Sequence, residues 1–157
     1  MNEDDFIVSK TDKKGCITYG NEIFIKMSGY SEKELLGAPH NLLRDEDMPS
    51  VVFQLLWERI QGKSTINAFV KNRCKNGDFY WVFANVTPSF DSKGNIIGYY
   101  SVRRKPKDKA LEVFKKLYAQ LRAVEKAEGV KSSETLLRKV LDEKGVSYDE
   151  FIISLQK

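Results

Sequence analysis

The sequence predicts an α+β domain with one five-stranded antiparallel sheet, short helices on one face of it, and a helical extension at the C-terminus. The strongest signal is the stretch 72–104, in which Asn76-Gly77 and the segment 91–95 mark turns between β-rich runs. The run between these turns, residues 79–86, is apolar on both parities of the period-2 pattern, so we expect both of its faces to be covered. A helical block separates these strands from an earlier hairpin, an order typical of an α+β domain.

Two short β-prone runs open the chain, residues 6–11 and 16–19, and a Gly-containing turn joins them. Asn21 then stands where a helix N-cap is expected. Ser31 and Glu34 form a capping box for a second helix. The N-terminal part of the chain therefore predicts a hairpin followed by two short helices.

A polar, proline-bounded segment follows at residues 39–49, and long polar connections within a compact domain tend to be functional. From Asp47 we expect a longer helix with Pro49 in its first turn. Its apolar face comprises Val52, Phe53, Leu56, Trp57 and Ile60. Residues 66–74 then form the strand that enters the Asn-Gly hairpin. This order places the helices on one face of the sheet, with a cavity between the two.

The pattern changes after Arg104, where residues 105–108 read as a linker. Apolar residues then recur at spacings of four and three, a heptad-like seam formed by Ala110, Phe114, Leu117, Leu121 and Val124. Two shorter amphipathic helices follow, the first at residues 133–144 and the second beginning after Ser147. We therefore divide the chain into a sensor-like domain, residues 1–104, and a helical extension, residues 105–157.

Composition excludes several classes of function. Apolar residues make up 41% and charged residues 31% of 157 positions, as in ordinary globular domains. The net charge of +4 arises from interspersed residues, which does not indicate a nucleic-acid-binding surface. No apolar run is long enough to insert in a membrane, so we expect a cytoplasmic protein. One histidine and two separated cysteines are too few for a metal site, and no catalytic constellation is present, so we do not expect an enzyme.

Short stretches between residues 6 and 104 resemble, in the same order, those of PAS domains, sensor modules with a five-stranded antiparallel sheet and a helical flank. Among PAS domains, the chain is similar to the flavin-binding sensors of aerotaxis receptors and of CetB-like energy-taxis proteins. The stretches that carry the resemblance are Asn21-Glu-Ile-Phe24, Ser28-Gly-Tyr30, Glu34-Leu-Leu-Gly37, Pro39-His-Asn41, Arg44 with Asp47-Met-Pro49, Lys71-Asn-Arg73, and Lys75-Asn-Gly-Asp78 with Tyr80-Trp-Val82.

This resemblance implies a non-covalently bound flavin, usually FAD, whose redox state the domain reports to a chemoreceptor. The candidate cofactor-binding residues are Asn21, His40, Arg44, Asp47, Trp57 and Asn72. Asn72 falls where family members place an amide that pairs with the flavin pyrimidine edge. Arg44 could meet a phosphate or a reduced flavin bidentately, and Trp57 could stack on the ring. Ordinary roles stay open: helix caps for Asn21 and Asp47, core packing for Trp57, and surface positions for Arg44 and Asn72.

Two alternatives to a flavin also stay open. A haem-binding gas sensor could use His40, the one histidine, as an axial ligand, although His40 lies in the polar segment and is also interpretable as a hydrogen-bonded structural residue. A cofactor-free interaction or dimerisation module would fill the cavity with its own side chains. Blue-light adduct chemistry is not expected, because residues 43–46 contain no cysteine and both cysteines lie on predicted strands.

If the 157 residues form the whole protein, it has a sensor but no output domain. We then expect a homodimer that acts through a partner, such as a chemoreceptor that recruits it to the inner membrane. The expected partner interface combines the second apolar face of the sheet with the heptad seam, at Trp81, Phe83, Phe114, Leu117 and Leu121. The alternative is that the first extension helix folds back over that same face.

Overall fold

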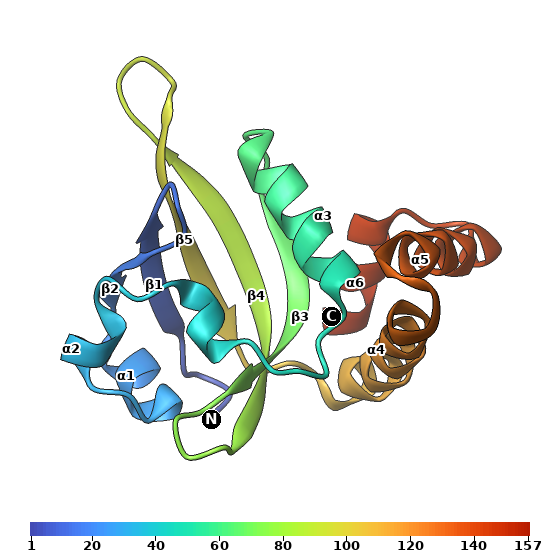
Figure 1. Cartoon of the computed structure of the whole chain (residues 1–157), viewed down its shortest axis with the longest axis horizontal. Coiled ribbons are helices and arrows are strands. Elements are labelled where there is room, and N and C mark those ends of the chain that lie inside the picture. The colour runs from blue at the N-terminus through green and yellow to red at the C-terminus, as the bar shows by residue number, and fades with distance from the viewer.

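The expected five-stranded antiparallel sheet is confirmed by the computed structural model, which describes all residues, 1–157 (Figure 1). Its strands lie in the order β2-β1-β5-β4-β3, so the N-terminal hairpin pairs with the C-terminal strand and β3 is an edge. The strands are β1 (Ile7–Asp12), β2 (Ile17–Gly20), β3 (Ile66–Arg73), β4 (Phe79–Phe90) and β5 (Ile96–Arg104). Adjacent residues in a strand point to opposite sides of the sheet. We call the side that carries Ser9, Val70 and Ala84 the inner face.

Three α-helices and one 3-10 helix connect β2 to β3 and cover the inner face (Figure 1). They are α1 (Glu22–Ser28), α2 (Glu32–Leu35), the 3-10 helix η1 (His40–Leu43) and α3 (Ser50–Gln61). The helix α3 begins at Ser50 rather than at Asp47, because Pro49 occupies the N-cap position. Pro49 has no side-chain donor or acceptor, so the first turn of α3 has no cap from its own sequence.

Local signals of the sequence account for the ends of these elements. A turn forms at Asn76-Gly77, where the sequence predicts it, but only Gly77 has positive φ, 93°, a conformation in which a Cβ would be strained. The two-residue hairpin turn that needs positive φ at both positions is therefore not formed, and the amide of Gly77 donates to the carbonyl of Cys74 instead. The capping box at Ser31 is complete, since its hydroxyl accepts from the amide of Glu34 while the Glu34 carboxylate accepts from the amide of Ser31.

The central part of β4 is covered on both faces, as its two apolar parities predict, whereas Phe79 at its start is 57% exposed. On the inner face, Val82 and Ala84 are buried in the core of the domain. On the outer face, the Phe83 ring packs against Phe69, and the Trp81 ring stacks on Tyr118, 6.0 Å away between centroids. Tyr118 belongs to the extension, which therefore supplies the second covering layer.

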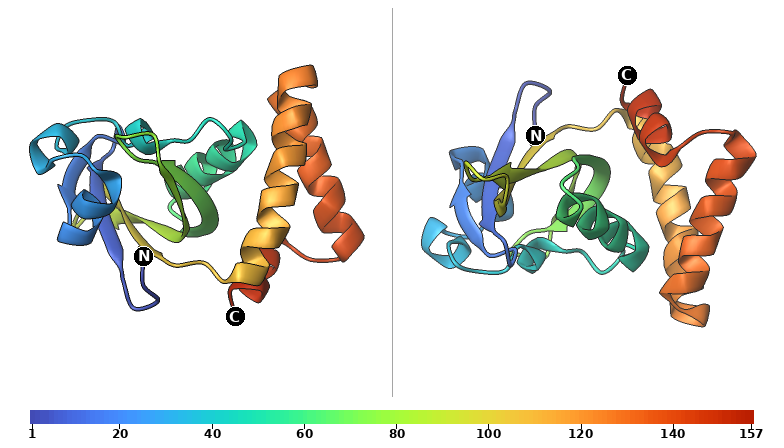
Figure 2. Two further views of the ribbon diagram at one scale, coloured as in Figure 1. Left: turned by 90° about the horizontal axis from the view of Figure 1, so that it is seen from below. Right: turned by 90° about the horizontal axis from the view of Figure 1, so that it is seen from above.

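The extension consists of α4 (Asp108–Glu128), α5 (Val130–Lys144) and α6 (Tyr148–Gln156). The second of these was expected to be short and to begin at Ser133; it begins at Val130, directly after Gly129 ends α4. Figure 2 shows the three helices packed beside the β3 edge and next to α3. None of the helices is long and apolar enough to pass through a bilayer.

Both polar and apolar contacts hold the extension on the β3 edge. The hydroxyl of Tyr118 donates to the carbonyl of Phe69 at 2.7 Å, and that of Tyr148 donates to the carbonyl of Asn67 at 2.9 Å. An edge strand carries unpaired main-chain groups that invite pairing with other chains. The extension therefore satisfies carbonyls that the sheet itself leaves free. Burial raises the pKa of the Tyr118 and Tyr148 phenols.

Candidate functional site

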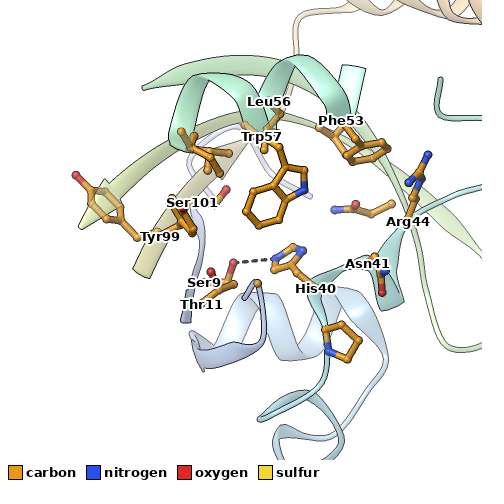
Figure 3. Close-up of a pocket in the computed structure, with 18 of the residues that line it drawn as sticks. Ser9, Thr11, His40, Asn41, Arg44, Phe53, Leu56, Trp57, Tyr99 and Ser101 are labelled. Atoms are coloured by element: carbon orange, nitrogen blue, oxygen red, sulfur yellow. Dashed lines mark hydrogen bonds between the residues drawn. The ribbon is translucent and has the colours of Figure 1, made fainter. Parts of the chain in front are cut away.

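A cavity of about 430 Å³ lies between the inner face of the sheet and the helices α3 and η1. This volume is within the range of pockets that hold small organic molecules. Figure 3 shows its lining residues pointing inward from both layers. Among them are Ser9, His40, Arg44, Phe53, Trp57, Val70, Asn72, Ala84, Tyr99, Ser101 and Arg103.

One end of the cavity is polar. The register of β1 against β5 places Ser9 opposite Ser101 and brings Arg103 onto the same face. The Arg103 guanidinium donates to the hydroxyl of Ser9 at 2.7 Å and lies 3.2 Å from Nε2 of His40. Because a guanidinium only donates, Nε2 must be the accepting nitrogen of a neutral imidazole. Burial and the charge of Arg103 lower the pKa of His40 to about 3, which is consistent with this protonation state.

Arg103 is a buried cation with no carboxylate partner. Its side chain is almost fully buried, 3% exposed, and it takes part in no salt bridge. Its guanidinium lies 4.9 Å from the centroid of the Phe24 ring, which offers a weak attraction. Burial lowers its pKa to about 10, so it remains charged at neutral pH. Burying an unpaired charge is costly, and such a residue is expected to face an anionic or strongly polar group.

Four buried polar atoms around this end of the cavity have no hydrogen-bond partner within the protein. Two of them are Oγ of Ser101 and Nε of Arg103. The other two, Nδ2 of Asn72 and Oη of Tyr80, belong to residues that face each other across β3 and β4, so these two side chains interact with each other without a well-aligned hydrogen bond. Buried polar groups in folded proteins are nearly always paired, so a cluster of orphaned atoms indicates a missing partner. Three of the four residues line the cavity itself, which makes a bound ligand the natural partner.

The other side of the cavity is aromatic. The Trp57 indole points from α3 into the cavity, across from His40 (Figure 3). Its ring meets Tyr99 edge-on, 5.6 Å between centroids, and closes that side of the space. A flat ring system placed here would therefore lie between an apolar wall and the polar end described above.

Arg44 stands at the mouth of the cavity, on the loop that follows η1. Its guanidinium lies 4.2 Å from the centroid of the Phe53 ring and donates to the hydroxyl of Ser50 at 3.0 Å. The main chain of Arg44 forms an isolated antiparallel bridge with Asn72, which fixes the loop to β3. Arg44 is exposed and free of carboxylate partners, so it can reach a ligand that extends out of the cavity.

The structure thus brings together four of the six candidate binding residues: His40, Arg44, Trp57 and Asn72. Asn21 does not line the cavity. Its side chain caps α1 by accepting from the amide of Phe24, and it also accepts from the amide of Val8 and donates to the carbonyl of Phe6. Its amide oxygen accepts two hydrogen bonds and one of its two N–H donors is used, all within the N-terminal part of the chain, so the capping interpretation applies.

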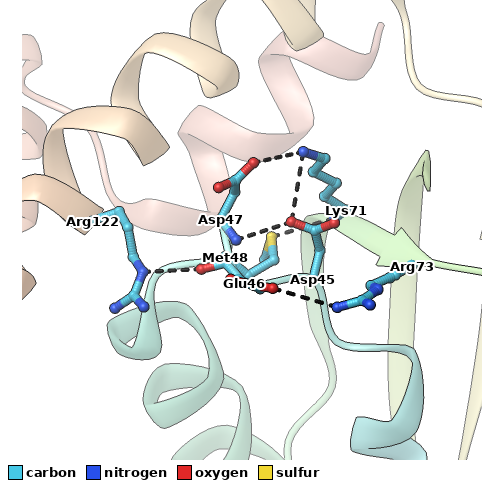
Figure 4. A network of polar contacts seen from close by, with 7 residues as sticks. All are labelled: Asp45, Glu46, Asp47, Met48, Lys71, Arg73 and Arg122. Carbon is cyan, nitrogen blue, oxygen red and sulfur yellow. Dashed lines mark hydrogen bonds and ion pairs between the residues drawn. The ribbon is translucent and has the colours of Figure 1, made fainter. Parts of the chain in front are cut away.

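Asp47 also lies outside the cavity. Its carboxylate is 75% exposed and accepts from Nζ of Lys71 at 2.7 Å (Figure 4). The hydrogen bond to Lys71 lowers the pKa of Asp47. Asp47 does not cap α3 either, because Pro49 occupies that position. The loop crosses the β3 edge at this point, and Lys71 draws the carboxylate away from the ligand side.

The residues expected at a partner interface lie within the molecule. Phe83, Phe114, Leu117 and Leu121 are buried, and Trp81 is half-buried against α4. The reason is the alternative stated above: the extension folds back on the outer face of the sheet. In this structure Phe114 of the heptad-like seam packs against Phe69 of β3 and Phe151 of α6, within the same chain.

Sequence reasoning missed Ser9, Ser101 and Arg103. A local signal existed, because Tyr99, Ser101 and Arg103 are alternate residues of one strand and therefore point to the same face of the sheet. Their convergence with Ser9 and His40 depends on the pairing of β1 with β5, about ninety residues apart, and no local pattern reports such pairing.

These residues fit a flavin. The pyrimidine edge of a flavin offers carbonyl and ring-nitrogen acceptors around one N–H donor, which complements an amide and a guanidinium. The unpaired atoms of Asn72 and Arg103 are donors of this kind, and Ser101 can donate or accept. Neither Cys16 nor Cys74 lines the cavity, and the Cys74 thiol donates to the carbonyl of Met27 instead. The cavity therefore offers no thiol for a covalent adduct.

Comparisons with solved structures agree on the fold. A light-oxygen-voltage domain studied with a flavin analogue superposes with a TM-score of 0.62 at 20% identity, covering 71% of this chain and 83% of that one. The light-state structure of the Aureochrome1 light-oxygen-voltage domain gives a TM-score of 0.60 at 23% identity, covering 80% and 92%. At these identities the likeness shows the fold alone.

Sequence comparisons identify the family. The aerotaxis receptor of Escherichia coli K12 is 40% identical over 123 residues, which are 78% of this chain and 24% of that protein. The nitrogen fixation regulatory protein of Klebsiella pneumoniae is 28% identical over 97 residues, 62% of this chain and 20% of that protein. The chain thus spans at most a quarter of the length of either relative, and no catalytic family is indicated. The family model described as the PAS fold matches residues 17–103, more than half of the chain, and the protein therefore belongs to the PAS family of sensor domains.

Proposed function

We propose that the protein binds FAD non-covalently in the cavity and acts as a redox or oxygen sensor in energy taxis. The observation that carries the proposal is the polar end of the cavity, where buried Arg103 has no carboxylate and orphaned donors surround a ring-sized space. The 40% identity with an aerotaxis receptor supports the sensory role. The PAS fold of residues 17–103 is in keeping with this role.

Each residue of the cavity has a distinct task in this proposal. A bound flavin supplies reversible redox chemistry that changes the charge and protonation of its pyrimidine edge. Asn72 pairs with that edge through its free amide, and Arg103 places a fixed positive charge beside it. His40 stays neutral and orients Arg103 through Nε2. Trp57 provides the apolar wall that excludes water from one side.

Signalling in this proposal runs from the sensor domain, residues 1–104, to the extension, residues 105–157. The main-chain bridge between Arg44 and Asn72 fixes the loop after η1 to β3, and the side chain of Arg44 bonds to Ser50 in the first turn of α3. A change in the hydrogen bonds of Asn72 and Arg44 would therefore move this loop and the start of α3. We further propose a cytoplasmic homodimer that a chemoreceptor recruits to the inner membrane. Exposed aromatic residues on the outer side of the N-terminal hairpin, including Phe6 and Tyr19, offer a surface for such contacts.

Haem is not part of the proposal. An axial ligand needs a free nitrogen lone pair aimed at the metal. In His40, the unprotonated Nε2 already accepts from Arg103 and contacts Ser9, and a fixed cation stands beside it. The orphaned polar atoms also argue against a cofactor-free module, because such a module would fill the cavity with apolar side chains.

The first test is reconstitution of the purified chain with excess FAD, followed by removal of free flavin and a visible absorption spectrum. We expect the two-band spectrum of a bound flavin. Asn72→Ala removes a buried hydrogen bond and should weaken FAD binding about tenfold, in line with about 1–1.5 kcal/mol for such a bond.

Asn85→Ala is the matched control, since Asn85 is an amide on the outer face of the same sheet and bonds to Asn67 and Thr65 there. It should leave FAD affinity unchanged. A folded wild-type chain that retains no flavin at saturating FAD would refute the proposal. Equal FAD affinities for Asn72→Ala and Asn85→Ala would remove Asn72 from the site while leaving the flavin in place.

A further inference from the structure

A second cavity, also of about 430 Å³, opens on the surface next to the first. It is lined by Asn41, Arg44, Asp45, Glu46, Met48 and Arg122. Asn41 and Arg44 line both cavities, so the two spaces are neighbours on either side of these two residues. A ligand with a ring in the first cavity can therefore extend a tail into the second.

The second cavity contains a cation from the extension. Arg122, on α4, donates through Nε to the main-chain carbonyl of Glu46 at 3.0 Å, which holds its guanidinium beside the loop. Its Nη1 lies 3.7 Å from a carboxylate oxygen of Glu125, a loose pairing. Both oxygens of that carboxylate already accept from the amides of Ser50 and Val51. Arg122 therefore retains most of its donors for another anion.

The two acidic residues of this cavity are paired elsewhere. The Asp45 carboxylate lies 3.5 Å from Nζ of Lys71 and accepts from the amide of Asp47. The Glu46 carboxylate is 82% exposed and lies 3.4 Å from Nη1 of Arg73, on the other side of the loop from Arg122 (Figure 4). Arg44 thus has no carboxylate partner, and Arg122 has only the 3.7 Å contact with Glu125; the first comes from the sensor domain and the second from the extension.

We propose that this second cavity binds the phosphate tail of a nucleotide cofactor, held between Arg44 and Arg122. Guanidinium groups bind phosphate oxygens bidentately, and two of them flanking one open cavity suit a phosphate or diphosphate group. The inference rests on the proposed flavin and adds one residue that the PAS segment itself does not contain. The extension thereby becomes part of the binding site, and it favours phosphorylated flavins over riboflavin.

The test compares the affinities of FAD, FMN and riboflavin for the full chain. Arg122→Gln removes the charge and keeps a hydrogen-bond donor on a shorter side chain. It should weaken FAD binding about tenfold, as expected for the loss of one charge-assisted contact, and leave riboflavin binding unchanged. Lys116→Gln, an exposed position on the same helix that lines neither cavity, is the control and should change neither affinity.

Sodium pyrophosphate provides a measurement that needs no variant. It should compete with FAD for the wild-type chain but not with riboflavin. Parallel affinities of all three flavins for wild type and Arg122→Gln, with no competition by pyrophosphate, would overturn the inference while leaving the flavin site standing. Absence of any flavin binding would overturn both. Thermal unfolding of each variant checks that the fold is retained.

Discussion

Glu125 joins the extension to the helix that lines the cavity, and its removal should be costly. Its carboxylate comes from α4 and accepts from the amide of Ser50 at 2.7 Å and from that of Val51 at 3.0 Å. The hydroxyl of Ser133 donates to it at 2.8 Å. The side chain is 2% exposed. Because Pro49 gives α3 no side-chain cap, Glu125 supplies from another helix the anion that an N-terminus favours.

The magnitude follows from these contacts. Loss of an N-cap side chain costs about 0.5–2 kcal/mol, and a buried hydrogen bond to a charged group contributes about 1.5–3 kcal/mol. Water can enter the space that Ala leaves, so the contributions do not simply add. We expect Glu125→Ala to lower the free energy of unfolding by about 3 kcal/mol. Glu125→Gln keeps one acceptor oxygen and should cost about 1–2 kcal/mol.

Urea unfolding followed by circular dichroism measures these changes, and hydrogen exchange locates them. The amides of Ser50 and Val51 should exchange faster in both variants, while the amides of β4 and β5 change only with global stability. Glu128→Gln is the control, because Glu128 is exposed on the same helix and its side chain forms no hydrogen bond or salt bridge. It should change stability by less than about 0.5 kcal/mol.

A loss below about 0.5 kcal/mol in Glu125→Ala, with unchanged exchange at Ser50 and Val51, would refute the reasoning. That result would mean that the extension does not cap α3 in solution. In that case water, and not Glu125, would accept the hydrogen bonds of the first amides of α3.

Two further predictions concern the polar end of the cavity. Arg103→Met removes a buried unpaired charge, so the ligand-free variant should be as stable as wild type within about 1 kcal/mol. The same substitution should weaken FAD binding at least tenfold. A loss of more than about 2 kcal/mol in urea unfolding would indicate that Arg103 has a structural role instead. The folded-state pKa of His40, about 3, lies below its ordinary value of 6.5, so only the unfolded chain takes up this proton as the pH falls through 6.5. Stability should therefore be full well above pH 6.5 and lower by roughly 2 kcal/mol at pH 5. His40→Gln should flatten this part of the curve, and identical slopes would show that His40 does not titrate this way.

The fold was predictable because its signals are local. Turn residues such as Asn76-Gly77 and capping residues such as Ser31 fix the ends of elements within a few positions of themselves. The double apolar pattern of β4 correctly predicted cover on both faces, and helical spacing placed Trp57 on the side of α3 that faces the sheet. Each of these inferences needs only the geometry of one element.

The roles of single polar residues were less predictable, because one side-chain chemistry serves several purposes. Asn21 and Asp47 carry groups that can bind a ligand, cap a helix or pair with lysine, and the structure assigns them to the second and third of these uses. Arg103 was missed for a different reason. Its importance comes from what it lacks, a carboxylate partner, and only the assembled sheet reveals that lack.

The partner of the heptad-like seam could not be predicted either, because an apolar stripe looks the same whether it packs on its own sheet or on another chain. What distinguishes the two is polar satisfaction. If the extension docked elsewhere, the first turn of α3 would lose its cap, and the carbonyls of Phe69 and Asn67 would lose the donors Tyr118 and Tyr148. Apolar contact is tolerant of position, whereas unpaired buried polar groups are costly. Matched donors and acceptors on both sides of this interface therefore specify one docking, and they make the extension a structural part of the sensor.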